Sequence, residues 1–164
     1  MHTKLALMMD LPEGKIPGFY AQIVKSLGNQ VQLFDRDKEM LIVNTEEDRQ
    51  IILDIMSHYK VASESLELLL LPREANLTDT FSDYGFLSKL DNTYLYMDKI
   101  SLFRFNTERR GTPEAELSQA LLQLEEHLIA YFSEKEEVIY VIDKQLTELA
   151  EGIARAYQCE IIWI

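Results

Sequence analysis

Two aspartates stand where predicted strands end, and they are the main candidates for catalytic chemistry in this sequence. Asp10 follows the apolar run at residues 3–9, and Asp143 follows the β-branched run at residues 138–142. Ligands of open α/β sheets collect beyond the carboxyl ends of the strands. If these strands are parallel neighbours, the two carboxylates share one rim and can bind Mg²⁺ or divide acid and base roles. The alternative is that each aspartate caps a helix or begins a turn, its commoner use.

A group of basic residues beside aromatic ones gives a second candidate site. The group consists of Lys99, Arg104, Arg109 and Arg110, with Tyr94, Tyr96, Phe103 and Phe105 nearby. Guanidinium groups bind phosphates and carboxylates, so Arg104, Arg109 and Arg110 are predicted to bind a partner such as a nucleotide or an acidic peptide. The alternative is that these arginines contact acidic residues of this chain or of another subunit, while the alternating aromatic side chains face a core.

The sequence predicts no metal site, no cofactor and no activated nucleophile. Its histidines, His2, His58 and His127, are scattered, and Cys159 is the only cysteine, so the spacing of zinc ligands is missing. The six glycines form neither a P-loop nor a dinucleotide-binding motif. Cys159 has no cysteine to pair with, and we expect it to be buried as a small apolar side chain.

The composition is that of an acidic globular protein. The 164 residues include 16 Lys and Arg against 28 Asp and Glu, a formal net charge of −12. This charge argues against general nucleic-acid binding, which needs basic side chains facing phosphates. The acid is concentrated in residues 113–164, where it either attracts a basic protein partner or serves solubility. No apolar run is long enough to span a membrane, and we expect a cytoplasmic protein.

The first half of the chain is predicted to contain two helices and four strands. A strand at residues 3–9 precedes a helix that ends at Gly28, and runs at 30–34 and 39–43 form a hairpin around residues 35–38. Thr45 caps the next helix, and residues 66–71 form a further strand, with a helix as the alternative. The resulting order, β-α-β-β-α-β, is that of ferredoxin-like folds.

The second half is predicted to end in a β-α-β unit after an irregular segment at residues 73–92. Strands at 93–97 and 100–105 precede a long helix, which begins at Pro113 and whose buried stripe runs from Leu117 to Phe132. A second line on this helix forms a predicted dimer seam of Ala115, Leu122 and Ile129; the alternative is that it is covered within its own domain. A strand at 138–142, a helix containing Gly152 and a strand at 160–164 follow, which implies a right-handed crossover and a parallel strand pair. Gly152 is expected to pack closely against a neighbouring backbone.

These elements predict an α/β fold, with α+β as the alternative. One domain of residues 1–164 is expected, with four main helices and a mixed sheet of about six to eight strands; its halves are residues 1–72 and 93–164. The first functional hypothesis is a non-enzymatic, acidic interaction or regulatory protein of the inhibitor or immunity type, which binds a protein partner and forms a homodimer through the seam described above. The alternative is a small enzyme, or a domain that senses a nucleotide or another ligand, with a carboxylate site at strand ends.

Overall fold

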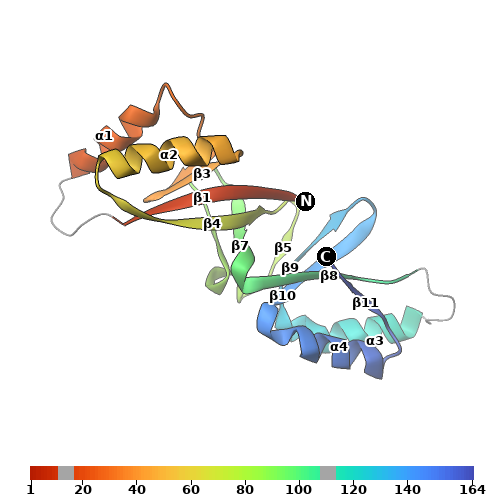
Figure 1. Ribbon diagram of the computed structural model, residues 1–164. Helices are drawn as coiled ribbons and strands as arrows, with labels where there is room; N and C mark the ends of the chain where they lie inside the picture. The colour runs from red at the N-terminus through yellow and green to blue at the C-terminus, as the bar shows by residue number, and fades with distance from the viewer. Residues whose placement is uncertain (11–16, 108–113) are drawn as a thin grey trace. The chain divides into compact units, whose positions relative to one another are not determined.

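The fold combines four α-helices and two antiparallel sheets within the residues described by this computed structural model, namely 1–10, 17–107 and 114–164 (Figure 1). The mixed fold class is confirmed, but the strands form sheets of six and five strands rather than one sheet. Contacts divide the chain into two compact units: unit 1 comprises Met1–Leu70 and Leu87–Tyr94, and unit 2 comprises Leu71–Phe86 and Leu95–Ile164. That the two units make up one domain stays a prediction.

Unit 1 contains the β-α-β-β-α-β order expected from the sequence. Its elements are β1 (His2–Asp10), α1 (Pro17–Leu27), β2 (Asp35–Asp37), β3 (Met40–Val43), α2 (Glu46–His58) and β4 (Ala62–Leu70). These strands lie in the order β2-β3-β1-β4, and the six-stranded sheet continues into β7 (Thr93–Tyr96) and β6 (Gly85–Leu87). Both helices cover one face of β1 and β3, where Leu7 and Leu41 pack with Ile23 and Ile52. Residues 66–70 are therefore a strand, not a helix.

The hairpin of unit 1 is shifted relative to its prediction. Its first strand, β2, falls on residues expected to form the turn, because Asp35 is buried and the Phe34 amide donates to the Ile42 carbonyl at 2.8 Å. The turn itself consists of Lys38 and Glu39, with Lys38 at φ 52°. The predicted strand at residues 30–34 is irregular instead.

Unit 2 repeats the same order of elements. It contains β8 (Ile100–Phe105), α3 (Glu114–Leu124), β9 (Leu128–Glu134), β10 (Glu137–Asp143), α4 (Thr147–Ala156) and β11 (Ile161–Trp163), in the sheet order β11-β8-β10-β9. The two-residue β5 (Asn76–Leu77) adds an edge beside β9. Both ends of α3 lie 97 positions after those of α1 (17 to 114, 27 to 124), and a Lys-Glu pair forms the hairpin turn in both units. Unit 2 is thus a second β-α-β-β-α-β unit.

The long helix expected after Pro113 is the main error of the sequence analysis. Helix α3 ends at Leu124, a 3₁₀ turn covers Glu125–His127, and Leu128–Glu134 form β9. Leu128 and Phe132 match helical spacing, but both are buried residues of β9. A register shift opposite Val141 and Ile142 interrupts the alternation of this strand, so its apolar residues show no clear period of two. The predicted dimer seam is not one helical line, because Ile129 belongs to β9 and is buried, while Leu122 is exposed on α3. The side chain of Ala115 lies outside the described residues.

Two smaller expectations about the end of the chain are also corrected. Strands β10 and β11 both pair antiparallel with β8, which lies between them, so they run in the same direction without forming a hydrogen-bonded parallel pair. Gly152 is exposed on α4, and a Cβ there would meet nothing within 4 Å, so no close backbone approach explains it.

Cys159 is buried, as expected. No helix in the described part of the chain is long and apolar enough to cross a membrane.

Candidate functional site

The two aspartates expected to share a rim lie in different sheets. Asp10 ends β1 of the six-stranded sheet, and Asp143 ends β10 of the five-stranded sheet, so the premise that their strands are neighbours is wrong. Asp143 acts as a helix cap: its Oδ1 accepts from the Gln145 amide at 2.8 Å and its Oδ2 from the Tyr84 hydroxyl at 2.7 Å. These two hydrogen bonds lower the pKa of Asp143. The capping alternative therefore accounts for this carboxylate.

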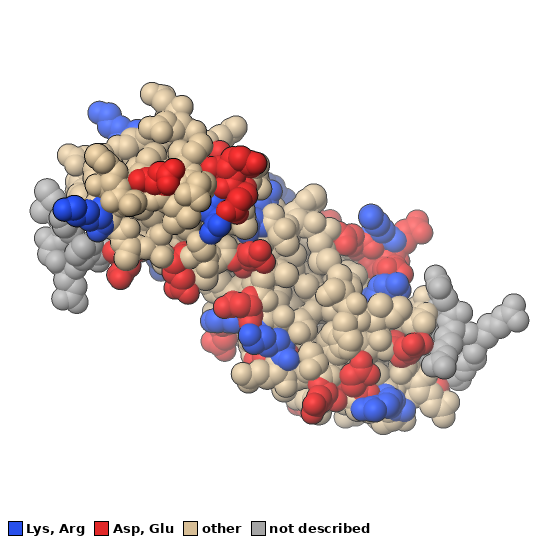
Figure 2. All heavy atoms as spheres, viewed as in Figure 1, with Lys and Arg blue, Asp and Glu red and all other residues tan. Residues whose placement is uncertain are grey.

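The basic candidate site is described only in part. Arg104 on β8 forms an ion pair with Glu137 at 3.0 Å, whereas Arg109 and Arg110 lie outside the described residues. Of the aromatic side chains near it, Tyr94, Phe103 and Phe105 are buried, which agrees with the alternative that they face a core. On the face shown in Figure 2, the basic side chains of the described residues stand singly or in small groups among acidic ones.

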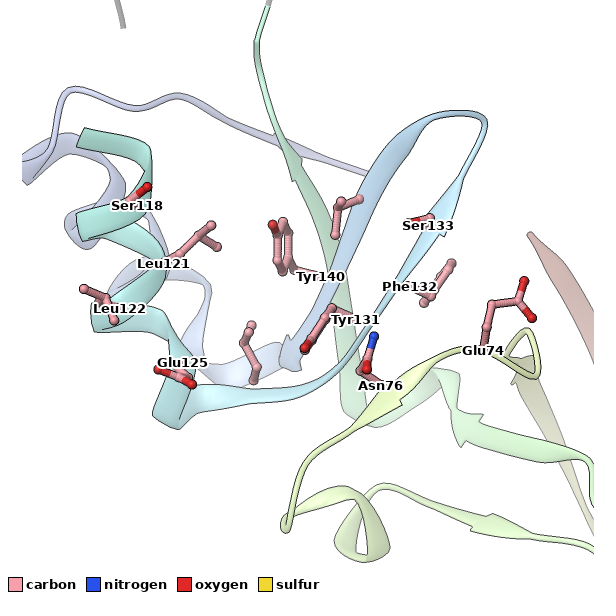
Figure 3. A pocket seen from close by; sticks show the side chains of 12 residues that line it. Glu74, Asn76, Ser118, Leu121, Leu122, Glu125, Tyr131, Phe132, Ser133 and Tyr140 are labelled. Carbon is pink, nitrogen blue, oxygen red and sulfur yellow. The ribbon is translucent and has the colours of Figure 1, made fainter. Parts of the chain in front are cut away.

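The described residues contain no group of three or more His, Cys, Asp or Glu side chains that could hold a metal ion. What they do contain is an apolar groove in unit 2, on the helix-covered side of its sheet (Figure 3). The groove has a volume of about 630 Å³. It lies between α3 and the β9–β10 hairpin, with Glu74 and Asn76 of the β5 segment at its other end. We call it the unit 2 groove.

The groove exists because α3 covers only part of the sheet. Nearer to α4, Phe103 and Phe105 are buried between sheet and helices, but Tyr131 and Val138 on the hairpin remain 37 % and 39 % exposed. Strand pairing places both on one face, since Tyr131 is opposite Tyr140 and Val138 opposite Ser133. On the facing helix, Leu122 is 60 % exposed. Monomeric proteins rarely leave apolar side chains clustered in this way unless the surface binds something.

Tyr140 forms a rigid wall of the groove. Its ring stacks on Phe103 at a centroid distance of 5.4 Å and lies 6.3 Å from the ring of Tyr131, and Leu121 points toward it from α3 (Figure 3). Burial, and the neighbouring Tyr131, raise the pKa of Tyr140. The hydroxyl therefore stays protonated at neutral pH and offers a hydrogen-bond donor beside an apolar surface.

The polar lining of the groove is acidic or neutral. The charged residues lining it are Glu74 and Glu125, and the neutral polar ones include Asn76, Ser118 and Ser133. No Lys or Arg is among the described lining residues. Glu125 sits directly after α3, at the end of the groove (Figure 3). A concave apolar surface with carboxylates at its edge attracts cations in preference to anions.

A buried carboxylate in unit 1 is a second feature that the sequence analysis missed. Oδ2 of Asp35 accepts hydrogen bonds from the Ser88 hydroxyl at 2.6 Å, the Asn92 amide at 3.0 Å and the Tyr94 hydroxyl at 2.8 Å. Burial raises the pKa of Asp35, but these bonds outweigh it, and the pKa lies below its ordinary value. Asp35 was assigned to a turn, so the only signal available was its place beside an apolar run. We infer a structural role, because its acceptor oxygens are occupied by residues of unit 1.

Comparison with known proteins gives little further information. No family model matches the sequence, and no curated protein matches it. Among solved structures, one match is a crystal structure of a putative glycine cleavage system transcriptional repressor, which is 10 % identical over 99 % of this chain and 94 % of that chain. The TM-score is 0.23, and at this level the likeness supports no inference about fold or function.

Proposed function

We propose that this chain is a regulatory binding protein whose unit 2 groove takes a small organic cation with an apolar or aromatic body. The observation that carries the proposal is the lining of the groove, in which exposed Leu122, Tyr131 and Val138 lie together with Glu74 and Glu125. Its volume of about 630 Å³ falls within the range of roughly 300–1,000 Å³ typical of small-molecule sites.

The groove suits a ligand with two distinct ends. Its apolar walls stabilise a bound hydrocarbon or aromatic group by about 25 cal/mol for each Å² removed from water. The carboxylates of Glu125 and Glu74, at opposite ends of the groove, favour a positively charged group at either end and oppose a negatively charged one. Tyr140, which is held by Phe103, offers an aromatic face for the body of the ligand.

Binding without catalysis is supported by the contacts of the three described carboxylates whose pKa values are lowered. Asp35 accepts from side-chain donors, Asp143 caps the start of the α4 region, and Glu46 is paired with Arg49. All three are therefore occupied by contacts within the fold. The earlier expectations of a basic protein partner and of a cytoplasmic location stay predictions.

The proposal is tested by NMR titration of the ¹⁵N-labelled protein with 4-phenylbutylammonium and, separately, with 4-phenylbutyrate. The two probes share an apolar body and differ in the sign of the charge. We expect the ammonium compound to shift the amide signals of Leu121, Leu122 and Tyr131 and to bind more tightly than the carboxylate. Equal binding of both probes, or shifts confined to other parts of the chain, would contradict the proposal.

A matched pair of variants tests the contribution of the carboxylate. Glu125→Gln keeps the shape of the side chain but removes a charge that lines the groove, and it should weaken binding of the ammonium probe about two- to fivefold, as expected for one exposed charge pair. Glu126→Gln removes the neighbouring charge, which does not line the groove, and serves as the control. If both variants weaken binding equally, net charge rather than the groove determines affinity.

A further inference from the structure

In unit 1, the helix that corresponds to α3 is tied directly to its hairpin. The Tyr20 hydroxyl on α1 donates to the Lys38 carbonyl in the hairpin turn at 2.6 Å. The guanidinium group of Arg36 on β2 lies 5.7 Å from the centre of the Tyr20 ring, within the range of a cation–π contact. A cationic side chain of the protein itself therefore covers the contact between this helix and its hairpin.

Unit 2 has neutral side chains at the corresponding positions of its hairpin. Arg36 lies opposite Leu41 in unit 1. At the offset that relates α1 to α3, Ser133 lies opposite Val138 in unit 2 (36 to 133, 41 to 138), and both residues line the unit 2 groove. The place of the guanidinium group in unit 1 is thus taken in unit 2 by a small hydroxyl, beside a groove that has room for an external cation.

The α3 end of the groove favours a positive charge for two reasons. Glu125, which follows α3 directly, lines the groove with its carboxylate. The carbonyl groups at the end of a helix carry a partial negative charge, and the last turn of α3 contains no basic residue that would offset it. The next residue along the chain that can become cationic, His127, lies 3.5 Å from the carboxylate of Glu126.

The opposite end of the groove offers a second set of acceptors. Glu74 and Asn76 lie there on the β5 segment (Figure 3). Carboxylate oxygens and a side-chain amide oxygen all accept hydrogen bonds from an ammonium group. The neighbouring Arg73 is exposed and is not among the described residues that line the groove. The groove therefore has a site for a cation at each end and apolar walls between them.

We propose that the ligand of the unit 2 groove is a linear dication, an apolar chain with an ammonium group at each end. The proposal rests on the binding function proposed above and adds the number of charges on the ligand and their separation. One ammonium group binds at Glu125 and the end of α3, and the other binds at Glu74 and Asn76. The chain between them lies along the exposed apolar side chains of the groove.

Calorimetric titration with two series of amines tests the second charge. The diamines run from 1,4-diaminobutane to 1,12-diaminododecane, and each is compared with the monoamine of equal chain length. Affinity for the monoamines should rise steadily with length, because each added methylene group buries more apolar surface. The ratio of diamine to monoamine affinity should instead peak at one length, where the diamine binds about two- to fivefold more tightly. A purely apolar groove prefers the monoamine, so a ratio below one at every length would overturn the proposal.

Matched variants distinguish the two ends of the groove from the net charge of −12, which attracts any dication. Glu74→Gln and Glu125→Gln should each abolish the preference for the diamine, since each removes the carboxylate at one end. Asp79→Asn and Glu126→Gln change the net charge equally, at exposed positions that do not line the groove, and should retain the preference. An equal loss of preference in all four variants would contradict the proposal.

The monoamines separate this inference from the proposed function. Monoamines and diamines that bind with equal affinity at every length, while shifting the amide signals of Leu121 and Tyr131, contradict the second charge alone and leave the groove as a site for a monocation. If no amine of either series binds in the groove, the proposed function is wrong, and this inference is wrong with it.

Discussion

Replacing Asp35 by Asn tests whether its buried carboxylate fixes the conformation of residues 88–92, the loop that connects β6 to β7. Three side-chain donors meet Oδ2, and the Arg36 amide donates to Oδ1 at 2.7 Å. An asparagine of the same shape can direct its oxygen at the three donors, but these bonds are then made to a neutral acceptor, and its NH2 group cannot accept from the Arg36 amide. A hydrogen bond to a charged group contributes about 1 kcal/mol more than one to a neutral group, which gives a loss of about 3 kcal/mol. The lower cost of burying a neutral side chain offsets part of this loss. We expect Asp35→Asn to lower the free energy of unfolding by about 2 kcal/mol at pH 7.

The assay is urea unfolding followed by far-UV circular dichroism, together with amide hydrogen exchange in the loop. Tyr94→Phe, which removes one donor, is the companion variant; it should cost about 2 kcal/mol alone and clearly less when Asp35 is already Asn. Independent, additive effects of the two substitutions, or a loss below about 0.5 kcal/mol for Asp35→Asn, would refute the role given to this carboxylate.

The pH dependence of stability has a definite sign. The pKa of Asp35 is lower in the folded protein than its ordinary value, so its stabilising effect is present above the unfolded pKa of about 3.9 and is lost as the pH falls through the folded pKa. The difference in stability between the wild-type protein and Asp35→Asn should therefore be largest near neutral pH and shrink below about pH 4. A difference that grows on acidification would contradict the direction of the shift.

Three further predictions concern other local features. Gly152→Ala should raise the free energy of unfolding by about 1 kcal/mol, because the added methyl group meets nothing and Ala favours the helix; a loss of stability would point to a role for the glycine that is not visible in its surroundings. Glu136→Gly should raise the free energy of unfolding by roughly 0.5–1 kcal/mol in the same assay, since Lys135 and Glu136 adopt φ angles of 49° and 68°, which L side chains disfavour. An unchanged unfolding midpoint would argue against strain in this turn. The hydrogen bond to Asp143 raises the pKa of Tyr84 to about 12. Asp143→Asn should therefore lower the pKa of Tyr84 toward 10 in an NMR titration of ¹³C-labelled tyrosine. A pKa that stays near 12 would assign the shift to burial instead.

The elements of unit 1 could be predicted because local signals agreed with tertiary structure there. Thr45 accepts from the Asp48 amide at 3.2 Å at the start of α2, as its sequence position indicated, and the apolar stripe of that helix faces the sheet. The strand at residues 66–70 and the order of elements followed from apolar runs bounded by turn residues. The hairpin was displaced because the burial of Asp35 depends on Ser88, Asn92 and Tyr94, which are more than 50 residues away in the sequence.

The repeat and the groove could not be predicted, for one shared reason. The spacing of Leu117, Leu121 and Leu124 continues through Leu128 and Phe132, so nothing local indicated that α3 stops and β9 begins. Without β9, the second β-α-β-β-α-β unit is incomplete and no longer resembles the first. The groove depends on the same boundary, because its walls are the end of α3 on one side and the β9–β10 hairpin on the other. Leu122 was predicted to be part of a dimer seam on a helix rather than of a groove.

The most direct test of the binding function is to locate the 4-phenylbutylammonium probe on the protein through intermolecular NOEs to methyl-labelled leucine and valine. The groove account predicts NOEs from the phenyl ring to the methyl groups of Leu121, Leu122 and Val138, and their disappearance when excess probe is washed out. NOEs to leucines outside unit 2 alone, or none at a probe concentration that saturates the chemical-shift changes, would contradict it.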